Sequence, residues 1–300
     1  MLRLLLVSVL CAACRSPSST VDASIEPRFR VATFNVLRFF DTVCESSQCD
    51  SDDYEALPSP ENFEARATQL ADAIIRLDAD VISLQEVETQ ACLDALLVRL
   101  GGVMPYGVLG ETNSAASVDV AVLSRTPLDK VVRHRESQPL TLPGGIVTSF
   151  SRELLEVHVR AEDGTNVVVF AVHFRSKSND DPARRLAEAQ VSSQVMNALA
   201  AAEPTALVVL GGDLNDTPGS PPLDALTIDG GLVRVADDLP ATDQATYHYQ
   251  GRGQAIDHLL ISPSSAAFRV PRSSRVWSDG SGYGGSDHSA LTSDFRISAP

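Results

Sequence analysis

Side chains able to perform hydrolytic chemistry recur at the ends of apolar segments in this sequence. Glu86 and His173 each end one apolar run, and Asp213 and Asn215 end a third. A carboxylate can hold a hard cation, and an imidazole can move a proton near neutral pH. Groups placed at the ends of rigid strands are also held in a fixed geometry. These positions therefore indicate a catalytic site built on strand ends.

Three more segments carry residues of the same kind. Asn35 ends the first apolar strand, Asp257 lies within a run of apolar residues, and Asp287 and His288 follow the glycine-rich stretch 280–285. A single Glu after an apolar strand is usually a solvated strand end, and a single His there usually makes a structural hydrogen bond. All of these segments together are better explained by one shared site.

The elements that must position these groups alternate along the chain. Apolar residues at helical spacing predict helices over 62–77 and 87–100, and Asp181 followed by Pro182 predicts the start of a helix to about residue 202. The acidic, turn-rich stretch 41–60 is expected to be a loop. Strands succeed one another between the helices, which favours two packed sheets with helices outside, in one domain. The predicted strands are 30–36, 80–84, 118–123, 130–133, 146–160, 166–174, 207–210, 255–261, 268–276 and 290–297.

The charge balance limits the kind of partner. Lys+Arg 24 against Asp+Glu 39 gives a net charge of −15, while 44% of residues are hydrophobic. These values exclude overall disorder and a broad basic surface for nucleic acid, because non-specific binding requires many phosphate contacts. Arg175, Lys177, Arg184 and Arg185 nevertheless lie within eleven residues of one another. They form either a local patch that receives a polyanion or a solvated helix start.

The N-terminus has the features of an export signal. Residues 1–14 combine one early Arg, a short apolar run and a small-residue region that ends at Cys14. They resemble a bacterial lipoprotein signal with Cys14 as the lipid-bearing residue, and plain secretion is the alternative. Residues 15–28 are expected to be a flexible tether and 29–300 the folded domain. We expect an exported monomer, in the cell envelope or secreted, whose only membrane contact is that lipid.

The remaining cysteines agree with export. Cys44 and Cys49 lie in one polar stretch, and an oxidising compartment would favour a disulfide between them. Two unpaired surface thiols are the alternative. Cys92 is expected to be a small buried hydrophobic residue on a helix.

The order of these motifs resembles the endonuclease/exonuclease/phosphatase superfamily over residues 29–297. The superfamily includes deoxyribonuclease I, abasic-site endonucleases, neutral sphingomyelinases and inositol polyphosphate 5-phosphatases. The resemblance depends on Gln85-Glu86-Val87, on the Gly-Gly-Asp213-Leu-Asn215 run and on Ser286-Asp287-His288. It implies an α/β fold, a four-layer α/β sandwich with two central, mostly antiparallel sheets flanked by helices.

The same resemblance implies a metal site. Glu86 matches the family's ligand for a divalent cation, Mg²⁺ or alternatively Mn²⁺. Asn35 and Asp287 match positions close to that cation. Carboxylate oxygen is the ligand type that a hard cation prefers.

The remaining roles concern the proton and the phosphate. His288 matches the base that activates the attacking water, and Asp257 matches the carboxylate that orients it. His173 matches the histidine of the deoxyribonuclease I and sphingomyelinase branches, a candidate general acid, where the abasic-site branch has a tyrosine motif. Asp213 and Asn215 match groups that position the water and the phosphoryl oxygens. Arg152 resembles a phosphate-contacting arginine, a role that suits a guanidinium fork.

Other histidines have plainer interpretations. His158 is expected on the surface, because Val157 and Val159 face the other way. His258 should point to the sheet face opposite Asp257. His248, between two tyrosines, is a weaker candidate for a substrate-binding loop.

The sequence therefore predicts a metal-dependent phosphodiesterase, most simply an exported nuclease that cleaves DNA, with RNA left open. A phosphatase or sphingomyelinase-like phospholipase of the same superfamily is the alternative, although aromatic residues make up only 5% of the chain and Trp277 is its single tryptophan. A catalytically dead binding protein is a remote third possibility, because the whole site set is present. The substrate, endo- or exonucleolytic cleavage and the number of metal ions are left open.

Overall fold

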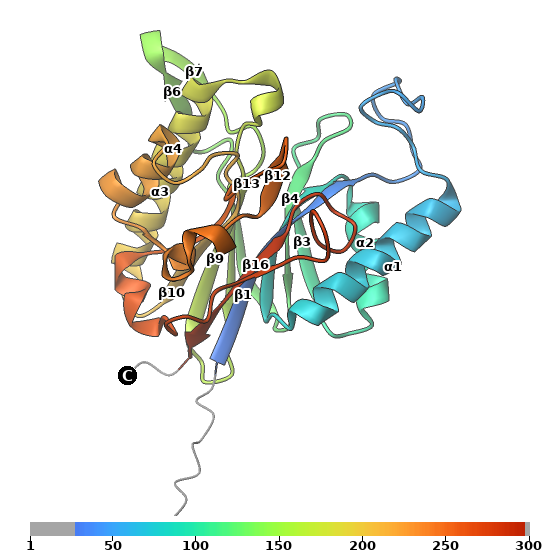
Figure 1. Ribbon diagram of the computed structural model, residues 1–300. Coiled ribbons are helices and arrows are strands. Elements are labelled where there is room, and N and C mark those ends of the chain that lie inside the picture. The colour runs from blue at the N-terminus through green and yellow to red at the C-terminus, as the bar shows by residue number, and fades with distance from the viewer. Residues whose placement is uncertain (1–27, 298–300) are drawn as a thin grey trace, which may run out of the picture.

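The computed structural model describes residues 28–297, which contain two six-stranded sheets packed face to face (Figure 1). Within each sheet one pair of strands is parallel, β1 with β2 and β9 with β10, and the other pairs are antiparallel. This arrangement confirms the predicted fold class. In spatial order the first sheet contains β15 (Arg275–Trp277), β16 (Ala290–Arg296), β1 (Arg28–Phe39), β2 (Val81–Val87), β4 (Asp119–Ser124) and β3 (Tyr106–Gly110). The second contains β11 (Val233–Arg234), β14 (Asp257–Ile261), β10 (Leu207–Asp213), β9 (Asn166–His173), β8 (Leu155–Arg160) and β5 (Leu128–Arg133).

Helices cover the outer face of each sheet (Figure 1). The first sheet carries α1 (Pro60–Leu77) and α2 (Gln90–Leu100), and the second carries α3 (Pro182–Ala202) and α4 (Pro221–Asp224). Two short hairpins complete the strands: β6 (Leu140–Leu142) with β7 (Ile146–Thr148), and β12 (Tyr247–Tyr249) with β13 (Arg252–Gln254). Short 3-10 turns span Pro143–Gly145, Lys177–Asn179, Val235–Asp238, Ala241–Asp243 and Pro263–Phe268, and a π turn spans Ala225–Asp229.

Three apolar clusters fill the three interfaces between these four layers. One lies between the first sheet and α1 and α2, one between the two sheets, and one between the second sheet and α3 and α4. Strand β9 shows how the sequence produces this, because alternate residues of a strand face opposite sides. Val167, Val169 and Ala171 belong to the cluster between the sheets, and Val168, Phe170 and Val172 belong to the helix-facing cluster. A strand that is buried on both faces therefore appears in the sequence as a continuous run of apolar residues.

The core between the sheets becomes polar toward one end of the strands. On β1, Val31 is followed on the same face by Thr33 and Asn35, all fully buried. On β10 of the other sheet, Gly211 and Asp213 lie at the same end of the inner face, and a Cβ on Gly211 would lie 3.4 Å from Ser83 Cβ and 3.5 Å from Thr33 Cβ of the first sheet. The two sheets therefore approach closely at this end while presenting polar side chains.

Helix ends agree with the sequence signals. The Asp181 side chain accepts a hydrogen bond from the Arg184 N–H at the start of α3, and Pro182 is its first residue. Gly101 adopts a left-handed conformation with φ of 59° and ends α2 after Leu100, the predicted last residue of the helix. Helix α2 begins at Gln90, because residue 87 still belongs to β2.

Two predicted strands are wrong in extent. The segment 146–160 is divided into β7 and β8, because the intervening loop turns away and the buried Glu188 carboxylate of α3 accepts its Ser151 N–H. The segment 268–276 forms the end of a 3-10 turn and a loop, and β15 begins only at Arg275. Strand β3 was not predicted, since its five residues include two glycines and form a sheet edge that runs from the exposed Tyr106 to the buried Gly110.

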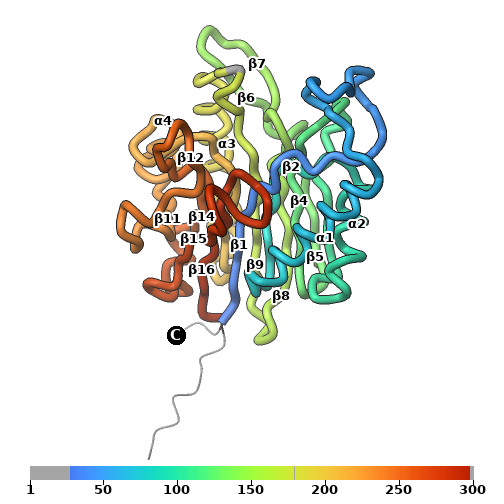
Figure 2. Tube along the Cα trace, turned by 45° about the vertical axis from the view of Figure 1, so that its right-hand side comes forward, coloured from blue at the N-terminus to red at the C-terminus, as the bar shows by residue number. Residues whose placement is uncertain are grey.

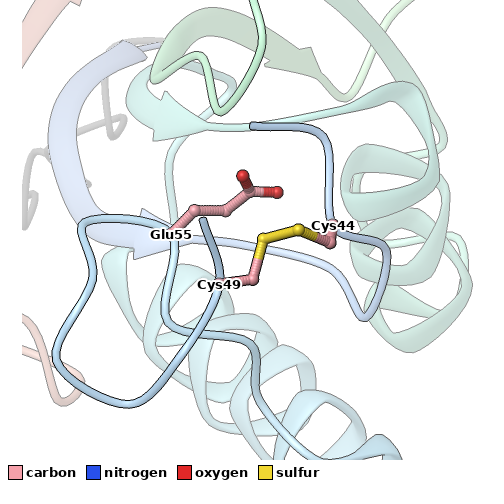
Figure 3. A group of neighbouring side chains, drawn as sticks. All are labelled: Cys44, Cys49 and Glu55. Carbon is pink, nitrogen blue, oxygen red and sulfur yellow. A yellow bond between two sulfur atoms is a disulfide. The ribbon is translucent and has the colours of Figure 1, made fainter. Parts of the chain in front are cut away.

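A disulfide between Cys44 and Cys49 closes a small ring in the loop after β1, which confirms that prediction (Figure 3). Glu55 lies beside the ring, and its buried carboxylate accepts the backbone N–H groups of Glu45 and Ser46, each at 2.6 Å. Cys92 is a free, buried residue of α2, as predicted. The disulfide and the hydrogen bonds to Glu55 thus stabilise the loop after β1 from within.

His158 is buried, so its predicted surface position is wrong. Its Nε2 lies 2.6 Å from Glu156 Oε1, and His134 Nε2 lies 2.8 Å from the other oxygen of the same carboxylate. These hydrogen bonds, together with Lys130, hold the pKa of Glu156 well below its ordinary value although burial raises it.

The two ends of the described chain lie side by side, since Arg28 of β1 is paired with Arg296 of β16 (Figure 2). The predicted signal 1–14, with Cys14, lies outside the described residues, as does the predicted tether except for Arg28, the first residue of β1. In the part of the chain that the structure describes, no helix is both long enough and apolar enough to cross a membrane.

Candidate active site

A cavity of about 640 Å³ opens at the polar end of the two sheets. Strands β9 and β10 run parallel, so His173 and Asp213, their last residues, are direct neighbours in the register. Strands β1 and β2 bring Asn35 and Glu86 to the same end from the other sheet. The cavity is lined by Leu37, Arg38, Tyr54, Glu86, Arg152, His173, Ser176, Lys177, Ser178, Asp213, Asn215, Tyr247, Tyr249, Gln254, Ile256, Asp287 and His288.

His288 and Asp257 form a hydrogen-bonded pair at the wall of this cavity. His288 Nδ1 lies 2.9 Å from Asp257 Oδ2, and the aspartate is almost completely buried. The other ring nitrogen, Nε2, lies 3.9 Å from Asp213 Oδ2. Burial lowers the pKa of His288, but the carboxylates of Asp257, Asp213 and Asp287 outweigh it and raise the pKa to about 10. The pair fixes the imidazole with Nε2 directed toward the cavity.

Asp213 lies at the centre of the cluster. Its Oδ1 accepts the backbone N–H of Asn215 at 2.8 Å, and its Oδ2 accepts the Asn35 amide at 3.1 Å. Burial and the charge of Asp257 raise the pKa of Asp213 to about 7, against the opposing charge of His288. Ligand atoms of Asp213, Asp257 and His288 lie within 4.8 Å of one another, so this cluster could hold a metal ion.

Asn35 links the two carboxylates that approach from different sheets. Its Nδ2 donates to Glu86 Oε1 at 3.2 Å as well as to Asp213, and its Oδ1 accepts the Leu37 N–H at 3.0 Å. The second Glu86 oxygen accepts the Arg38 N–H at 2.8 Å. The amide of Asn35 therefore orients the carboxylates through hydrogen bonds.

The donor set around Glu86 suits a hard divalent cation. Glu86 is half-buried and lines the cavity together with Asp287. Asp287 Oδ1 is buried and, among the described residues, accepts no hydrogen bond. An unpartnered carboxylate oxygen is costly to bury unless a cation or water satisfies it. Oxygen ligands of this kind are those that Mg²⁺ and Mn²⁺ use, so the residues fit the predicted site.

His173 lies beside the same Asp213 oxygen, with Nε2 at 3.7 Å. Burial, reinforced by the positive charges of Arg152 and His288, lowers the pKa of His173 well below its ordinary value. A neutral imidazole donates a hydrogen bond but carries no extra proton. Its Nδ1 is buried and makes no hydrogen bond to a side chain in the described chain.

Four residues that line the cavity have left-handed backbone conformations: Leu37, Arg38, Glu86 and Asn215. Glu86 has a φ of 68° and Asn215 a φ of 52°, a region that residues with a side chain rarely adopt. Such conformations cost about 1–3 kcal/mol and persist where surrounding structure imposes them. Here the hydrogen bonds to Arg38 and Asp213 hold these two residues in place.

The four basic residues over 175–185, for which a polyanion-binding patch and a solvated helix start were both left open, do not form a single patch. Arg185 is buried in ion pairs with Asp180 and Asp216. Lys177 also pairs with Asp216, at 2.9 Å, and lines the cavity. Arg152, the predicted phosphate-contacting residue, lines the cavity as well.

Sequence reasoning missed the aromatic residues around the cavity. Tyr54 comes from the loop between β1 and α1, with the Arg38 guanidinium 4.5 Å from its ring centre. Tyr247 packs on His288 at 4.8 Å between ring centres, and Tyr249 lines the cavity as well. The signal for the last two is alternation along β12, which directs Tyr247 and Tyr249 to the cavity and places His248 outside its lining.

His258 points away from the site, as predicted. It is fully buried on the opposite face of β14 from Asp257, between the Arg234 guanidinium and the Asp216 carbonyl. Burial lowers its pKa to about 4.

Solved structures share this fold at low sequence identity. An endonuclease/exonuclease/phosphatase from Bacteroides vulgatus aligns with a TM-score of 0.65 and 16% identity, covering 91% of this chain and 100% of that one. SmcL aligns with a TM-score of 0.63 and 18% identity over 90% and 99% of the two chains. D. rerio TDP2 complexed with a single-strand DNA product aligns with a TM-score of 0.59 and 18% identity over 90% and 99%.

Comparison with curated protein sequences found no match. The model of the Endonuclease/Exonuclease/phosphatase family, in contrast, matches residues 32–288, which span the first and the last of the site positions. Members of this family are typically dependent on divalent metals. The chain therefore belongs to the endonuclease/exonuclease/phosphatase family, whose members are phosphoester hydrolases.

Proposed function

We propose that this protein is a divalent-metal-dependent phosphodiesterase that cleaves nucleic acid, with DNA as its main substrate. The observation that carries the proposal is the arrangement in one cavity of the His288–Asp257 pair, the Glu86 and Asp287 carboxylates, and Arg152. The set supplies a base, a cation site and a phosphate contact, which are the three requirements of metal-assisted hydrolysis.

Each residue has a defined task in this mechanism. Glu86 and Asp287 would hold the cation, whose charge polarises the phosphoryl group when it is bound. The carboxylate charges that raise the pKa of His288 would be offset by a bound cation, and the neutral His288 Nε2 would then accept a proton from the water that attacks phosphorus. The Asp257 carboxylate keeps Nδ1 protonated and the ring oriented. The bond from phosphorus to the leaving oxygen breaks as the new bond forms.

Four residues position the phosphoryl group and the water. Arg152 offers a guanidinium fork to two phosphoryl oxygens. Asn215 and the neutral His173 donate hydrogen bonds from amide and ring nitrogen, His173 to the leaving oxygen in place of a general acid. Asp213, held by Asn35, directs the attacking water. Asn35 thus acts on the site through the carboxylates it orients.

The cavity wall supports a nucleic-acid substrate. Tyr54, Tyr247 and Tyr249 line it, and Tyr249 is 54% exposed. Aromatic rings beside a cationic groove are the usual surface on which single-stranded bases stack. The D. rerio TDP2 complex shows a single-strand DNA product on the same fold.

A phospholipase is the second candidate, and one observation favours it. Ile146 and Val147 of β7 are 61% and 68% exposed on the projecting hairpin, and exposed apolar residues are suited to a lipid surface (Figure 1).

A side-by-side substrate screen tests the proposal. The full mature chain, with Mg²⁺ or Mn²⁺, is assayed on single-stranded DNA, plasmid DNA, RNA, sphingomyelin vesicles and inositol phosphates. We expect cleavage of DNA that stops when the cation is chelated. Turnover of sphingomyelin or inositol phosphates alone would contradict the proposal.

We also propose that the protein is exported, either as an envelope lipoprotein carrying a lipid on Cys14 or as a secreted monomer. The Cys44–Cys49 disulfide supports export, because disulfides persist in oxidising compartments. Fractionation of the producing cell, with mass analysis of the mature N-terminus, tests this. Recovery of the uncleaved chain from the cytoplasm would contradict it.

A further inference from the structure

A second cavity, of about 330 Å³, adjoins the active site and has a strongly basic wall. Arg135, Arg152, Arg175 and Arg184 all line it, and all four are half-buried. Arg152 and Tyr54 line the active-site cavity as well, so the two cavities share a wall. In a chain with a net charge of −15, four arginines around one depression are a concentrated positive surface.

The fold brings these arginines together from four segments. Arg135 follows β5, Arg152 precedes β8, Arg175 follows β9, and Arg184 lies in the first turn of α3. Arg184 donates to the Ser149 carbonyl from both Nε and Nη2, at 3.2 and 2.8 Å. The Ser149 carbonyl therefore orients the Arg184 guanidinium, and because a carbonyl is neutral it does not neutralise the positive charge.

Arg135 is anchored in the same way. Its Nε donates to the Phe150 carbonyl at 3.1 Å. Among the described residues, neither Arg135 nor Arg184 forms an ion pair with a carboxylate. No carboxylate of the described chain therefore neutralises either guanidinium beside the cavity.

The carboxylates around this cavity are occupied by other donors. Glu188 accepts the backbone N–H groups of Ser151 and Arg175, each at 2.7 Å. Glu153 accepts those of His134 and Arg135, also at 2.7 Å.

Asp119 lies in the wall of the second cavity itself. It accepts hydrogen bonds from the hydroxyls of Thr112 and Ser117, at 2.9 and 2.8 Å. The buried acids thus fix the loops that carry the arginines, and none of them forms an ion pair with Arg135 or Arg184. The cavity is a built cationic site.

We infer that the second cavity binds a further phosphodiester of the strand whose scissile phosphate lies in the active site. Guanidinium forks bind phosphate oxygens in pairs, and half-burial strengthens such contacts compared with open solvent. Arg152 would then lie between the two phosphates. The inference rests on the proposed nuclease function and adds a requirement for substrates longer than one phosphodiester. A choline headgroup, being a cation, would be repelled from this wall.

Direct binding tests the inference without turnover. The full chain is titrated into a fluorescein-labelled 12-nucleotide DNA in EDTA, and anisotropy is measured at several salt concentrations. For Arg135→Gln/Arg184→Gln we expect the Kd to rise roughly tenfold or more, the scale of removing one charge-assisted hydrogen bond. The slope of log K against log salt should become shallower by about 0.7 for each phosphate of the single strand that the variant no longer neutralises. An unchanged Kd and slope would overturn the inference.

Two further variants are controls for misfolding and for a general effect of net charge on DNA binding. Arg175→Gln keeps the backbone N–H that Glu188 holds, so it should weaken binding without loosening the loop. Arg160→Gln removes the same charge at the opposite end of β8, where the side chain is 63% exposed, and should bind like wild type. Melting temperatures close to that of wild type establish folding. If Arg160→Gln weakened binding as much as the cavity variants, the effect would be one of net charge and the inference would fail.

Kinetics separates this inference from the proposed function. Bis(p-nitrophenyl) phosphate has one phosphodiester and reaches only the active site, whereas the oligonucleotide reaches both cavities. We expect the double variant to raise KM for the oligonucleotide roughly tenfold and to hydrolyse the small diester within about twofold of wild type. Equal losses on both substrates would contradict the second site. A wild-type protein that bound DNA through these arginines but cleaved neither substrate would refute the proposed function alone.

Discussion

Disrupting the His288–Asp257 pair should lower kcat by an amount that can be estimated from the geometry of the pair. The 2.9 Å contact joins a buried carboxylate to the imidazole, and such a charge-assisted hydrogen bond contributes about 1.5–3 kcal/mol. At 1.36 kcal/mol per tenfold change in rate, Asp257→Asn should lower kcat by roughly 10- to 150-fold. His288→Ala removes the base of the proposed mechanism and should lower kcat by about 10²- to 10⁴-fold. Because the two residues act as one unit, the double variant should be little slower than His288→Ala.

A double-mutant cycle on the phosphodiester that the screen identifies measures this coupling. KM should change less than kcat, because neither residue is assigned a phosphate charge to neutralise. His258→Ala is the matched control, since His258 is buried on the opposite face of the same strand and does not line the cavity. Its kcat should match wild type at temperatures where it is folded. Losses that multiply fully across the cycle would refute the pair as a functional unit.

Three predictions concern the fold. Glu156→Gln should destabilise the protein by about 2–3 kcal/mol at neutral pH, because it removes a buried carboxylate that accepts hydrogen bonds from two histidines. The folded-state pKa of Glu156 lies below its unfolded value of about 4.3, so the carboxylate stabilises the fold above that pH and this stabilisation is lost as the pH falls. In denaturant titrations, the difference in the free energy of unfolding between wild type and Glu156→Gln should therefore be smaller at pH 3 than at pH 7. Reducing the Cys44–Cys49 bond should lower the stability of its loop by about 2 kcal/mol, and limited proteolysis with intact-mass analysis should show faster cutting there only after reduction. Gly211→Ala should destabilise by about 1–3 kcal/mol, since its Cβ would lie 2.9 Å from Leu259 Cδ2 in the same sheet and 3.4 Å from Ser83 Cβ in the opposite sheet, and an unchanged melting temperature would contradict the close packing at this position.

The sequence predicted the parts of the site that depend on local order. Glu86, His173 and Asp213 each follow an apolar run, and parallel neighbours necessarily end at the same edge of a sheet. The pairing of His288 with Asp257 came from family resemblance, because nothing in the local sequence indicates that residues 31 positions apart would meet. The structure places them in contact.

What the sequence could not reveal depends on contacts between distant segments. The loop that ends β7 is held by Glu188, a residue 37 positions from Ser151, so periodicity alone favoured one continuous strand. His158 is buried and hydrogen-bonded to Glu156, whose other oxygen bonds His134, a residue 24 positions from His158. Tyr54 lines the cavity together with Glu86 and His173, residues 32 and 119 positions away from it in the sequence.

The central claim is that Glu86 and Asp287 hold a divalent cation for phosphodiester hydrolysis. Calorimetric titration of Mn²⁺ into the full chain and into Glu86→Gln tests it most directly, because glutamine keeps the shape of the side chain and removes one ligand charge. The account predicts saturable binding to the wild-type chain that weakens at least tenfold in Glu86→Gln, on the scale of removing a charged ligand. Equal Mn²⁺ affinity in the two proteins would contradict it.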